Sequence, residues 1–118
     1  MKNHTDLEQS KKLTKILSDE TADFFWLIGH LHTDGPKYQV IRTRNEVSEP
    51  ETCWPCWSLA ALMNVLPSAT LDSSDDHYYR VHCKERFTDW YDNPIDACVA
   101  MIDRLHREMI YNFNFNNS

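Results

Sequence analysis

The chain has 118 residues, of which 42% are apolar and 25% are charged. This composition is ordinary for one soluble globular domain and excludes disordered, collagen-like and membrane classes. The formal net charge of −6 repels a phosphate backbone, so nucleic acid is a poor candidate partner. Only two glycines, Gly29 and Gly35, are present. The chain therefore lacks the Gly-rich loop that cradles phosphates, and we expect no nucleotide cofactor.

The most apolar stretch of the chain runs from Phe24 to Leu31 and is interrupted by His30. It is too short to cross a bilayer, which takes about 20 residues. We therefore expect a cytoplasmic protein that does not insert into a membrane. In that compartment the four cysteines are expected as free thiols.

The first third of the chain combines a helix signal with a hairpin signal. Thr5 and Glu8 have the spacing of a capping box, which predicts a helix from about residue 6 to residue 17. Aromatic and β-branched residues fill the segments 24–28 and 38–44. Gly35 and Pro36 lie between them, and this pattern predicts a β-hairpin.

The middle of the chain begins with an acidic, proline-containing segment at 45–55, which we interpret as a linker. Ser58 is a good N-cap residue. Apolar residues follow it at helical spacing, and Pro67 prevents further turns. The pattern predicts a short helix over residues 59–65, followed by a Ser/Asp-rich loop.

The last third of the chain predicts a strand pair and a long helix. Residues 78–84 alternate between apolar and polar, which is typical of a half-buried strand, and 87–91 is expected to pair with it. Asn93 and Pro94 are an N-cap and a first helical residue. They begin a helix to about residue 110, whose apolar positions are Ile95, Cys98, Val99, Ile102, Leu105 and Met109.

The order helix, hairpin, helix, hairpin, helix predicts an α+β fold, with an antiparallel sheet of about four strands covered by three helices. We expect residues 1–110 to form a single domain. Residues 111–118 are rich in asparagine and are expected to form a flexible polar tail.

Three stretches carry a resemblance: Leu7 to Leu13, Trp57 to Pro67, and Trp90 to Cys98. Together they resemble a group of small uncharacterised proteins that are common in gut Bacteroides-type bacteria and their mobile elements. The resemblance covers about a third of the chain. It implies a small α+β domain, and it brings no activity, ligand or catalytic residue.

Cys53-Trp54-Pro55-Cys56 precedes the predicted helix at 59–65. A CxxC pair at a helix N-terminus can cycle between dithiol and disulfide. Together with His30 and His32 it would also supply two sulfur and two nitrogen ligands for zinc. These residues define a thiol-redox or zinc-binding alternative. Two incidental thiols are the simpler interpretation, and Cys83 and Cys98 are better explained as small buried hydrophobes.

The chain has more large aromatic rings than a small core hides completely. Trp54 lies in the proline-flanked linker and Trp57 directly after it, and exposed tryptophans rimmed by acids are typical of protein-binding patches. The leading hypothesis is therefore a non-catalytic module that binds a protein partner or forms a homo-oligomer through Trp54 and Trp57. No catalytic residue is assigned, because no spacing in the chain requires a nucleophile and base.

Overall fold

The computed structural model describes residues 2–31, 35–41 and 52–113, and it confirms the α+β class. Its elements are α1 (Leu7–Leu13), a 3₁₀ turn (Asp19–Thr21), β1 (Phe24–Leu31), β2 (Gly35–Ile41), β3 (Thr52–Cys56), α2 (Leu59–Val65), β4 (Thr70–Ser73), β5 (Tyr79–Cys83), β6 (Arg86–Phe87) and α3 (Pro94–Arg107). In these described segments no helix has the length and apolar character that a membrane span needs.

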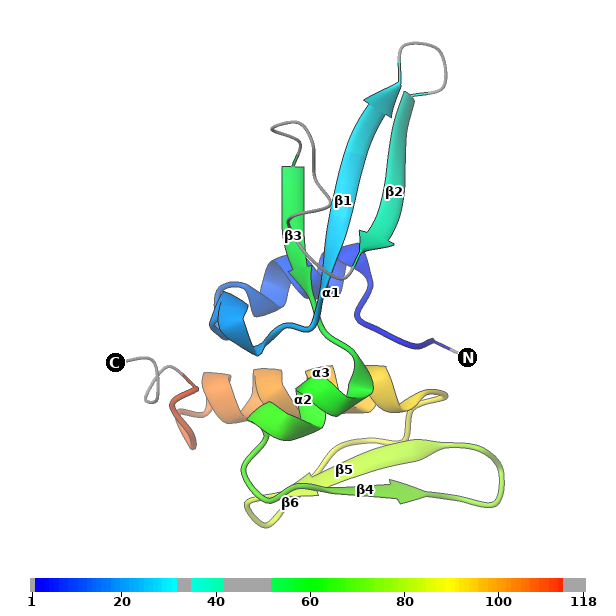
Figure 1. The fold of residues 1–118 in the computed structure, drawn as a ribbon. Helices are drawn as coiled ribbons and strands as arrows, with labels where there is room; N and C mark the ends of the chain where they lie inside the picture. The colour runs from blue at the N-terminus through cyan, green and yellow to red at the C-terminus, as the bar shows by residue number, and fades with distance from the viewer. Residues whose placement is uncertain (1, 32–34, 42–51, 114–118) are drawn as a thin grey trace.

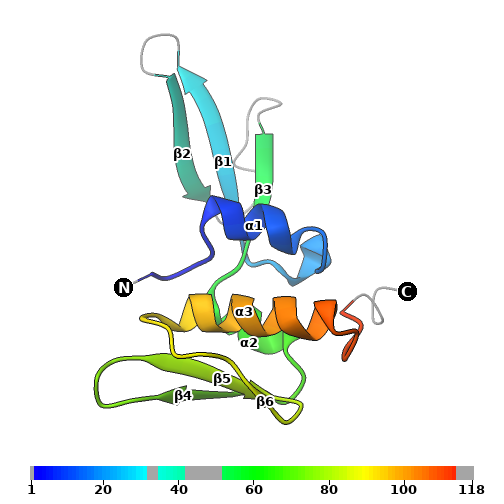
Figure 2. The ribbon, with the colours of Figure 1, turned by 180° about the vertical axis from the view of Figure 1, so that it is seen from behind.

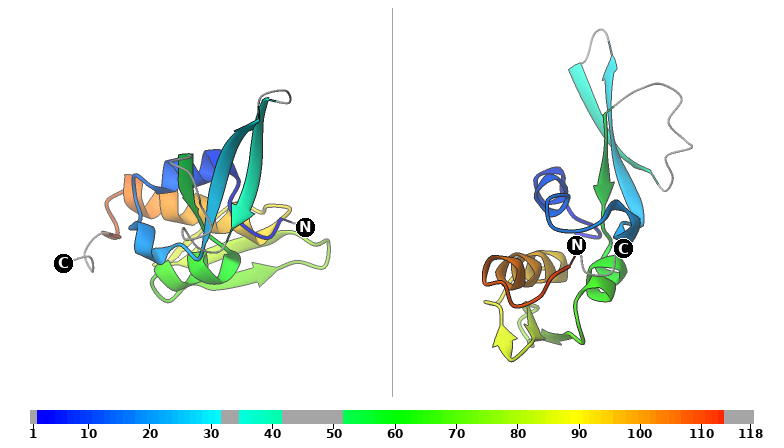
Figure 3. Two further views of the ribbon diagram at one scale, coloured as in Figure 1. Left: turned by 45° about the horizontal axis from the view of Figure 1, so that its top comes forward. Right: turned by 90° about the vertical axis from the view of Figure 1, so that its left-hand side faces the viewer.

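In the described part of the chain, six strands form two antiparallel sheets with the helices between them (Figure 1). The hairpin sheet has the order β2-β1-β3, and the lower sheet has the order β4-β5-β6. Seen from either side, α1 lies at the base of the hairpin sheet, while α2 and α3 lie between α1 and the lower sheet (Figure 2). The β1-β2 hairpin projects away from this body (Figure 3). The strands are thus divided between two sheets, whereas the sequence predicted one sheet of about four.

The hairpin sheet contains a strand that the sequence analysis placed in a linker. Residues 52–56 form β3, in which Trp54 lies opposite Trp26 of β1. Residues 45–51 of the expected linker lie outside the described residues. Pro55 is compatible with this strand because β3 is at the edge of the sheet, where one side of the backbone needs no ladder hydrogen bond.

The lower sheet confirms the predicted strand at 78–84 and adds one that was not predicted. β4 pairs with β5 and lies within the expected Ser/Asp-rich loop. The predicted strand over residues 87–91 is reduced to the two residues of β6 and a bridge between Tyr79 and Tyr91. Lys84 and Glu85 join β5 to β6 with φ angles of 52° and 63°, which are the left-handed values that a two-residue hairpin turn requires.

The first helix begins one residue later than its predicted capping box. The N-cap is Asp6, whose carboxylate accepts from the Gln9 N–H while the Gln9 side chain accepts from the Asp6 N–H. Thr5 is unavailable as a cap because it is buried and its hydroxyl accepts from the N–H of Trp57, 3.1 Å away. The helix ends at Leu13 rather than near residue 17.

The other two helices begin where the sequence predicts. The Ser58 hydroxyl accepts from the Ala61 N–H at the start of α2, and the Asn93 side chain accepts from the Asp96 N–H at the start of α3. The chain leaves α3 at Arg107, and Met109, at a φ of 56°, is 90% exposed. Met109 is therefore not part of the buried stripe that was predicted for this helix.

The core lies between α3, α2, β5 and the start of the chain. Its fully buried members include Leu13, Trp57, Leu62, Val81, Ile95, Met101, Ile102 and Leu105. Phe113 is also buried, and Tyr111 packs against the same cluster. The segment expected to be a flexible tail from residue 111 is thus docked as far as Phe113, because these two rings cover the end of the core. Residues 114–118 lie outside the described part.

Candidate functional site

The outer face of the lower sheet gathers exposed aromatic side chains. Along β5, Val81 and Cys83 are buried in the core, so the alternating residues Arg80 and His82 face outward. Tyr78, Phe87 and Trp90 are the large exposed rings near them, at 47%, 46% and 45% exposure. We call this surface the aromatic face; it consists of Tyr78, Arg80, His82, Phe87 and Trp90.

Arg80 holds two of these rings together. Its guanidinium carbon lies 4.4 Å from the centroid of the Phe87 ring and 4.7 Å from that of Trp90. Its Nε donates to Asp72 Oδ2 at 3.1 Å, and Asp72 lies opposite Arg80 in the strand register. Cation–π contacts at exposed sites are each worth about 0.5–1 kcal/mol. The arginine therefore orders the two rings before any partner arrives.

His82 extends the stack along the sheet. Its ring is parallel to that of Phe87, with a centroid distance of 4.2 Å and an interplanar angle of 6°. The two residues lie opposite each other in the β5-β6 register. A row of four flat groups thus runs from His82 through Phe87 and Arg80 to Trp90.

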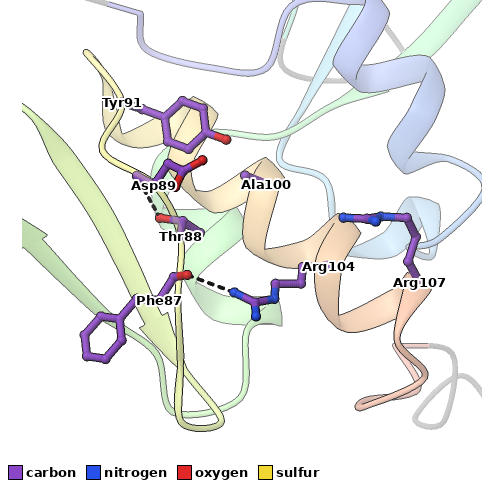
Figure 4. Close-up of a pocket in the computed structure, with 7 residues that line it drawn as sticks. All are labelled: Phe87, Thr88, Asp89, Tyr91, Ala100, Arg104 and Arg107. Atoms are coloured by element: carbon purple, nitrogen blue, oxygen red, sulfur yellow. Dashed lines mark hydrogen bonds between the residues drawn. The ribbon is translucent and has the colours of Figure 1, made fainter.

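The segment that carries Phe87 and Trp90 is held in place by hydrogen bonds to β5 and α3. Tyr79 and Tyr91 exchange backbone hydrogen bonds of 2.7 Å, and the Thr88 hydroxyl accepts from the Val81 N–H at 2.9 Å. Figure 4 shows the Arg104 guanidinium of α3 reaching the carbonyl oxygen of Phe87, a hydrogen bond of 2.9 Å. The aromatic face is therefore preorganised on regular secondary structure.

Two cavities near this segment share residues with the aromatic face. One, of about 170 Å³, lies between residues 87–91 and α3 (Figure 4) and is lined by Phe87, Thr88, Asp89, Tyr91, Ala100, Arg104 and Arg107. The other, of about 380 Å³, is lined by Ser74, Asp76, Tyr78 and Trp90. The second cavity opens on the aromatic face and shares Tyr78 and Trp90 with it.

The charge around the aromatic face is negative. Arg80 is paired with Asp72. Asp75, Asp76 and Asp89 are exposed, and within residues 2–31, 35–41 and 52–113 no ion pair or side-chain hydrogen bond engages their carboxylates. Three carboxylates without a cationic partner therefore lie on the two segments that border the aromatic face, and Asp76 lines a cavity together with Tyr78 and Trp90.

The two tryptophans predicted to bind a partner are placed differently. Trp57 has no exposed surface, and its indole N–H donates to the Thr21 hydroxyl at 2.8 Å. This position in the core corrects its assignment to a contact patch. Trp54 is half-buried on β3, and the ammonium of Lys11 lies 5.6 Å from its ring centroid.

The CxxC pair does not form a site in this fold. Cys53 lies opposite Leu27 and Cys56 opposite Phe24, so the two thiols are three residues apart on a strand and point to opposite faces. Their Cα atoms are about 10 Å apart at the usual strand rise, beyond the reach of a disulfide. Burial raises the pKa of the Cys56 thiol to about 11, although the hydrogen bond from the Thr5 hydroxyl acts to lower this pKa.

The histidines proposed as zinc ligands bring no further support. His30 belongs to β1, whose outer half has no described side chains, and His32 lies outside the described residues. Within the described part of the chain, no three side chains of histidine, cysteine, aspartate or glutamate are grouped as metal ligands.

Sequence reasoning identified only part of the aromatic face. The alternation of residues 78–84 predicts a half-buried strand, which is β5, and the surplus of large aromatic rings predicts that some of them are exposed. No local signal showed that Arg80 would join them, because the contact depends on the β5-β6 register. No protein family, curated protein or solved structure matches this chain. The resemblance to Bacteroides-type proteins stays an expectation.

Proposed function

We propose that the chain is a non-catalytic binding module that docks another protein on its aromatic face. The observation that carries the proposal is the row of exposed rings ordered by Arg80. Aromatic residues and arginine dominate the energetic centres of protein interfaces, because they bury a large area at a small cost in side-chain entropy. The preorganised backbone at Phe87 lowers that cost further.

The charge pattern favours a different protein over a second copy of this chain. In a two-fold symmetric dimer the same patch contacts itself. The exposed carboxylates of Asp75, Asp76 and Asp89 would then be brought together with the same set from the second copy, and like charges across an interface oppose binding. A homo-oligomer through this face is accordingly the weaker form of the proposal.

The alternative of a thiol-redox or zinc-binding protein has little geometric support. It requires Cys53 and Cys56 to act together, and their register on β3 separates them. The docking proposal requires no group beyond those that the aromatic face already holds together.

The test is selection of binding peptides against matched variants. A phage-displayed library of random dodecapeptides is selected on the wild-type protein, and each selected peptide is then titrated against Phe87→Ala, Trp90→Ala and Met109→Ala. Met109 is exposed and lies outside the aromatic face, so its variant is the control. We expect Phe87→Ala and Trp90→Ala to weaken binding about tenfold or more, in the range of interface anchors, and Met109→Ala to leave it unchanged.

Circular dichroism melting of each variant verifies that it is folded. Peptides that bind all three variants as tightly as the wild type would overturn the proposal. Failure of repeated selections to yield any specific peptide would also overturn it. Sedimentation of the wild type at high concentration tests the homo-oligomer, which Trp90→Ala should disrupt if it forms through this face.

A further inference from the structure

The cavity beside the aromatic face has the chemistry of a receptor for a positively charged side chain. It is lined by the two aromatic residues Tyr78 and Trp90 together with Asp76 and Ser74. Its volume of about 380 Å³ is at the lower end of the range for small-ligand sites. That size suits the end of one long side chain.

The hairpin between β4 and β5 holds this cavity in shape. The Ser74 N–H donates to the Tyr78 carbonyl at 2.9 Å, and the Tyr78 N–H donates to the Ser74 hydroxyl at 3.2 Å. His77 closes the turn in the left-handed region, at a φ of 65°. Asp76 therefore lies in a closed turn, two residues after Ser74, whose hydroxyl accepts from the Tyr78 N–H.

The ring surfaces suit a flat cation. Trp90 already has the guanidinium of Arg80 at 4.7 Å from its centroid, so a guanidinium is bound to this ring within the molecule itself. Arginine stacks on aromatic rings more readily than lysine does, because its charge is spread over a plane and is weakly hydrated. A second arginine, from a partner, would meet the same type of surface at Tyr78 and Trp90.

The charges of the cavity select the same ligand. Asp76 lines it and Asp75 adjoins it, and in the described part of the chain neither has a cationic partner. Arg80 does not neutralise Asp75 or Asp76, because its guanidinium is already paired with Asp72 at 3.1 Å. A carboxylate next to two ring faces attracts a guanidinium and repels a phosphate or an acidic peptide.

We infer that this cavity binds an arginine side chain of the partner protein. The inference rests on the proposed docking function and specifies its chemistry. The guanidinium stacks on Tyr78 and Trp90 while it donates hydrogen bonds to the carboxylate of Asp76. Phe87 and His82 contact the residues that flank this arginine.

The experiment is a titration of the ¹⁵N-labelled protein with acetyl-Gly-Arg-Gly-amide, followed by nuclear magnetic resonance. The comparison peptide contains citrulline, which keeps the shape of arginine and removes its charge. Trp90→Phe assigns the indole N–H signal of Trp90. We expect the arginine peptide to shift that signal in a saturable manner, and the citrulline peptide to shift it by less than a quarter as much.

Two variants connect the signal to the cavity. Asp76→Asn should weaken binding of the arginine peptide about threefold or more, the effect of one exposed charge pair. Glu8→Gln removes one negative charge from α1, on another surface, and should leave the affinity unchanged. No saturable shift, equal shifts with citrulline, or an unchanged affinity of Asp76→Asn would overturn the inference.

The same measurements separate this inference from the docking function. Selected peptides that require Phe87 but contain no arginine would overturn the arginine cavity and leave the aromatic face as a docking surface. Peptides that ignore Phe87 and Trp90 altogether would overturn both.

Discussion

The indole N–H of Trp57 donates a 2.8 Å hydrogen bond to the hydroxyl of Thr21 inside the core, and the ring has no exposed surface. Trp90, in contrast, is 45% exposed and contacts Arg80. Two tryptophans of one chain thus have opposite roles. Trp57 connects α2 and the start of the chain to the core, whereas Trp90 belongs to the surface.

The first prediction compares the removal of these two rings. Trp57→Ala should lower the free energy of unfolding by about 3–5 kcal/mol, because it removes a buried ring and leaves a cavity. Trp90→Ala should lower it by about 1 kcal/mol or less, the value of an exposed cation–π contact. Urea denaturation followed by far-ultraviolet circular dichroism measures both. An equal loss for the two variants would show that Trp90 is a core residue and would remove it from the docking surface.

The second prediction concerns the thiols. Burial raises the pKa of Cys56 to about 11 and that of Cys98 to about 12, and it also raises the pKa of Cys83. At pH 8 a thiol of pKa about 11 is about one-thousandth ionised, and the thiolate is the reactive form. We expect maleimide labelling of the native protein to modify Cys53 well before the other three.

Mass spectrometry of proteolytic fragments gives the order of labelling, and labelling in urea, where all four thiols should react, is the control. A mild oxidant should not join Cys53 to Cys56, because β3 separates them. Rapid labelling of Cys56, or a disulfide between these two residues, would restore the thiol-redox alternative.

The elements that the sequence predicted well are those specified by neighbouring residues. Ser58 and the apolar spacing after it define α2, and Asn93 and Pro94 begin α3. The alternation along β5 likewise predicted which of its residues are buried. Capping and periodicity act within a few residues, so they are readable without the fold.

The features that the sequence did not predict depend on residues far apart in the chain. Cys53-Trp54-Pro55-Cys56 has the composition of a helix-preceding motif, yet pairing with β1 makes it a strand. Thr5 has the spacing of an N-cap, but its hydroxyl accepts a hydrogen bond from the N–H of Trp57 and does not cap the helix. Trp57 is buried because it packs in one cluster with α2, α3 and the start of the chain, and this packing also depends on residues far apart in the sequence.

The third prediction concerns the ionic cluster that joins the start of the chain to α3. Asp96 accepts from Lys2 at 2.9 Å and from Gln9 at 2.7 Å on one oxygen, and from Asn93 at 2.8 Å on the other. Burial raises the pKa of this carboxyl, but the three hydrogen bonds outweigh burial and hold the pKa below its ordinary value. Asp6, which also accepts from Lys2, has a lowered pKa as well.

A carboxyl with a lower pKa in the folded state stabilises the fold above its unfolded pKa, about 3.9, and this contribution is lost as the pH falls through the folded value. Asp96→Asn should therefore be less stable than the wild type by about 1 kcal/mol at pH 6, since partial exposure limits the effect. The difference should shrink as the pH falls below about 3.9. Asp75→Asn, which alters an exposed carboxyl outside this cluster, is the control, and urea denaturation across the pH range is the measurement. A difference that stayed constant down to pH 2 would contradict an ionic origin.

The fourth prediction concerns the turn that sets the register of the aromatic face. Lys84 and Glu85 both adopt left-handed backbone angles, with φ of 52° and 63°, which costs about 1–2 kcal/mol per non-glycine residue. Glycine removes most of this cost but gains freedom in the unfolded chain, worth about 0.5–1 kcal/mol. Glu85→Gly should therefore stabilise the protein by about 0.5–1 kcal/mol.

Glu85→Ala is the matched control, because it removes the same side chain and keeps the left-handed cost. We expect its stability to be equal to that of the wild type or slightly lower. Thermal melting of the two variants decides between relief of backbone strain and loss of a side chain: equal shifts would exclude strain relief. The register of β6 opposite β5 should survive in Glu85→Gly, so His82 stays stacked on Phe87. The variant should then bind selected peptides with the affinity of the wild type, because the turn positions the aromatic face without being part of it.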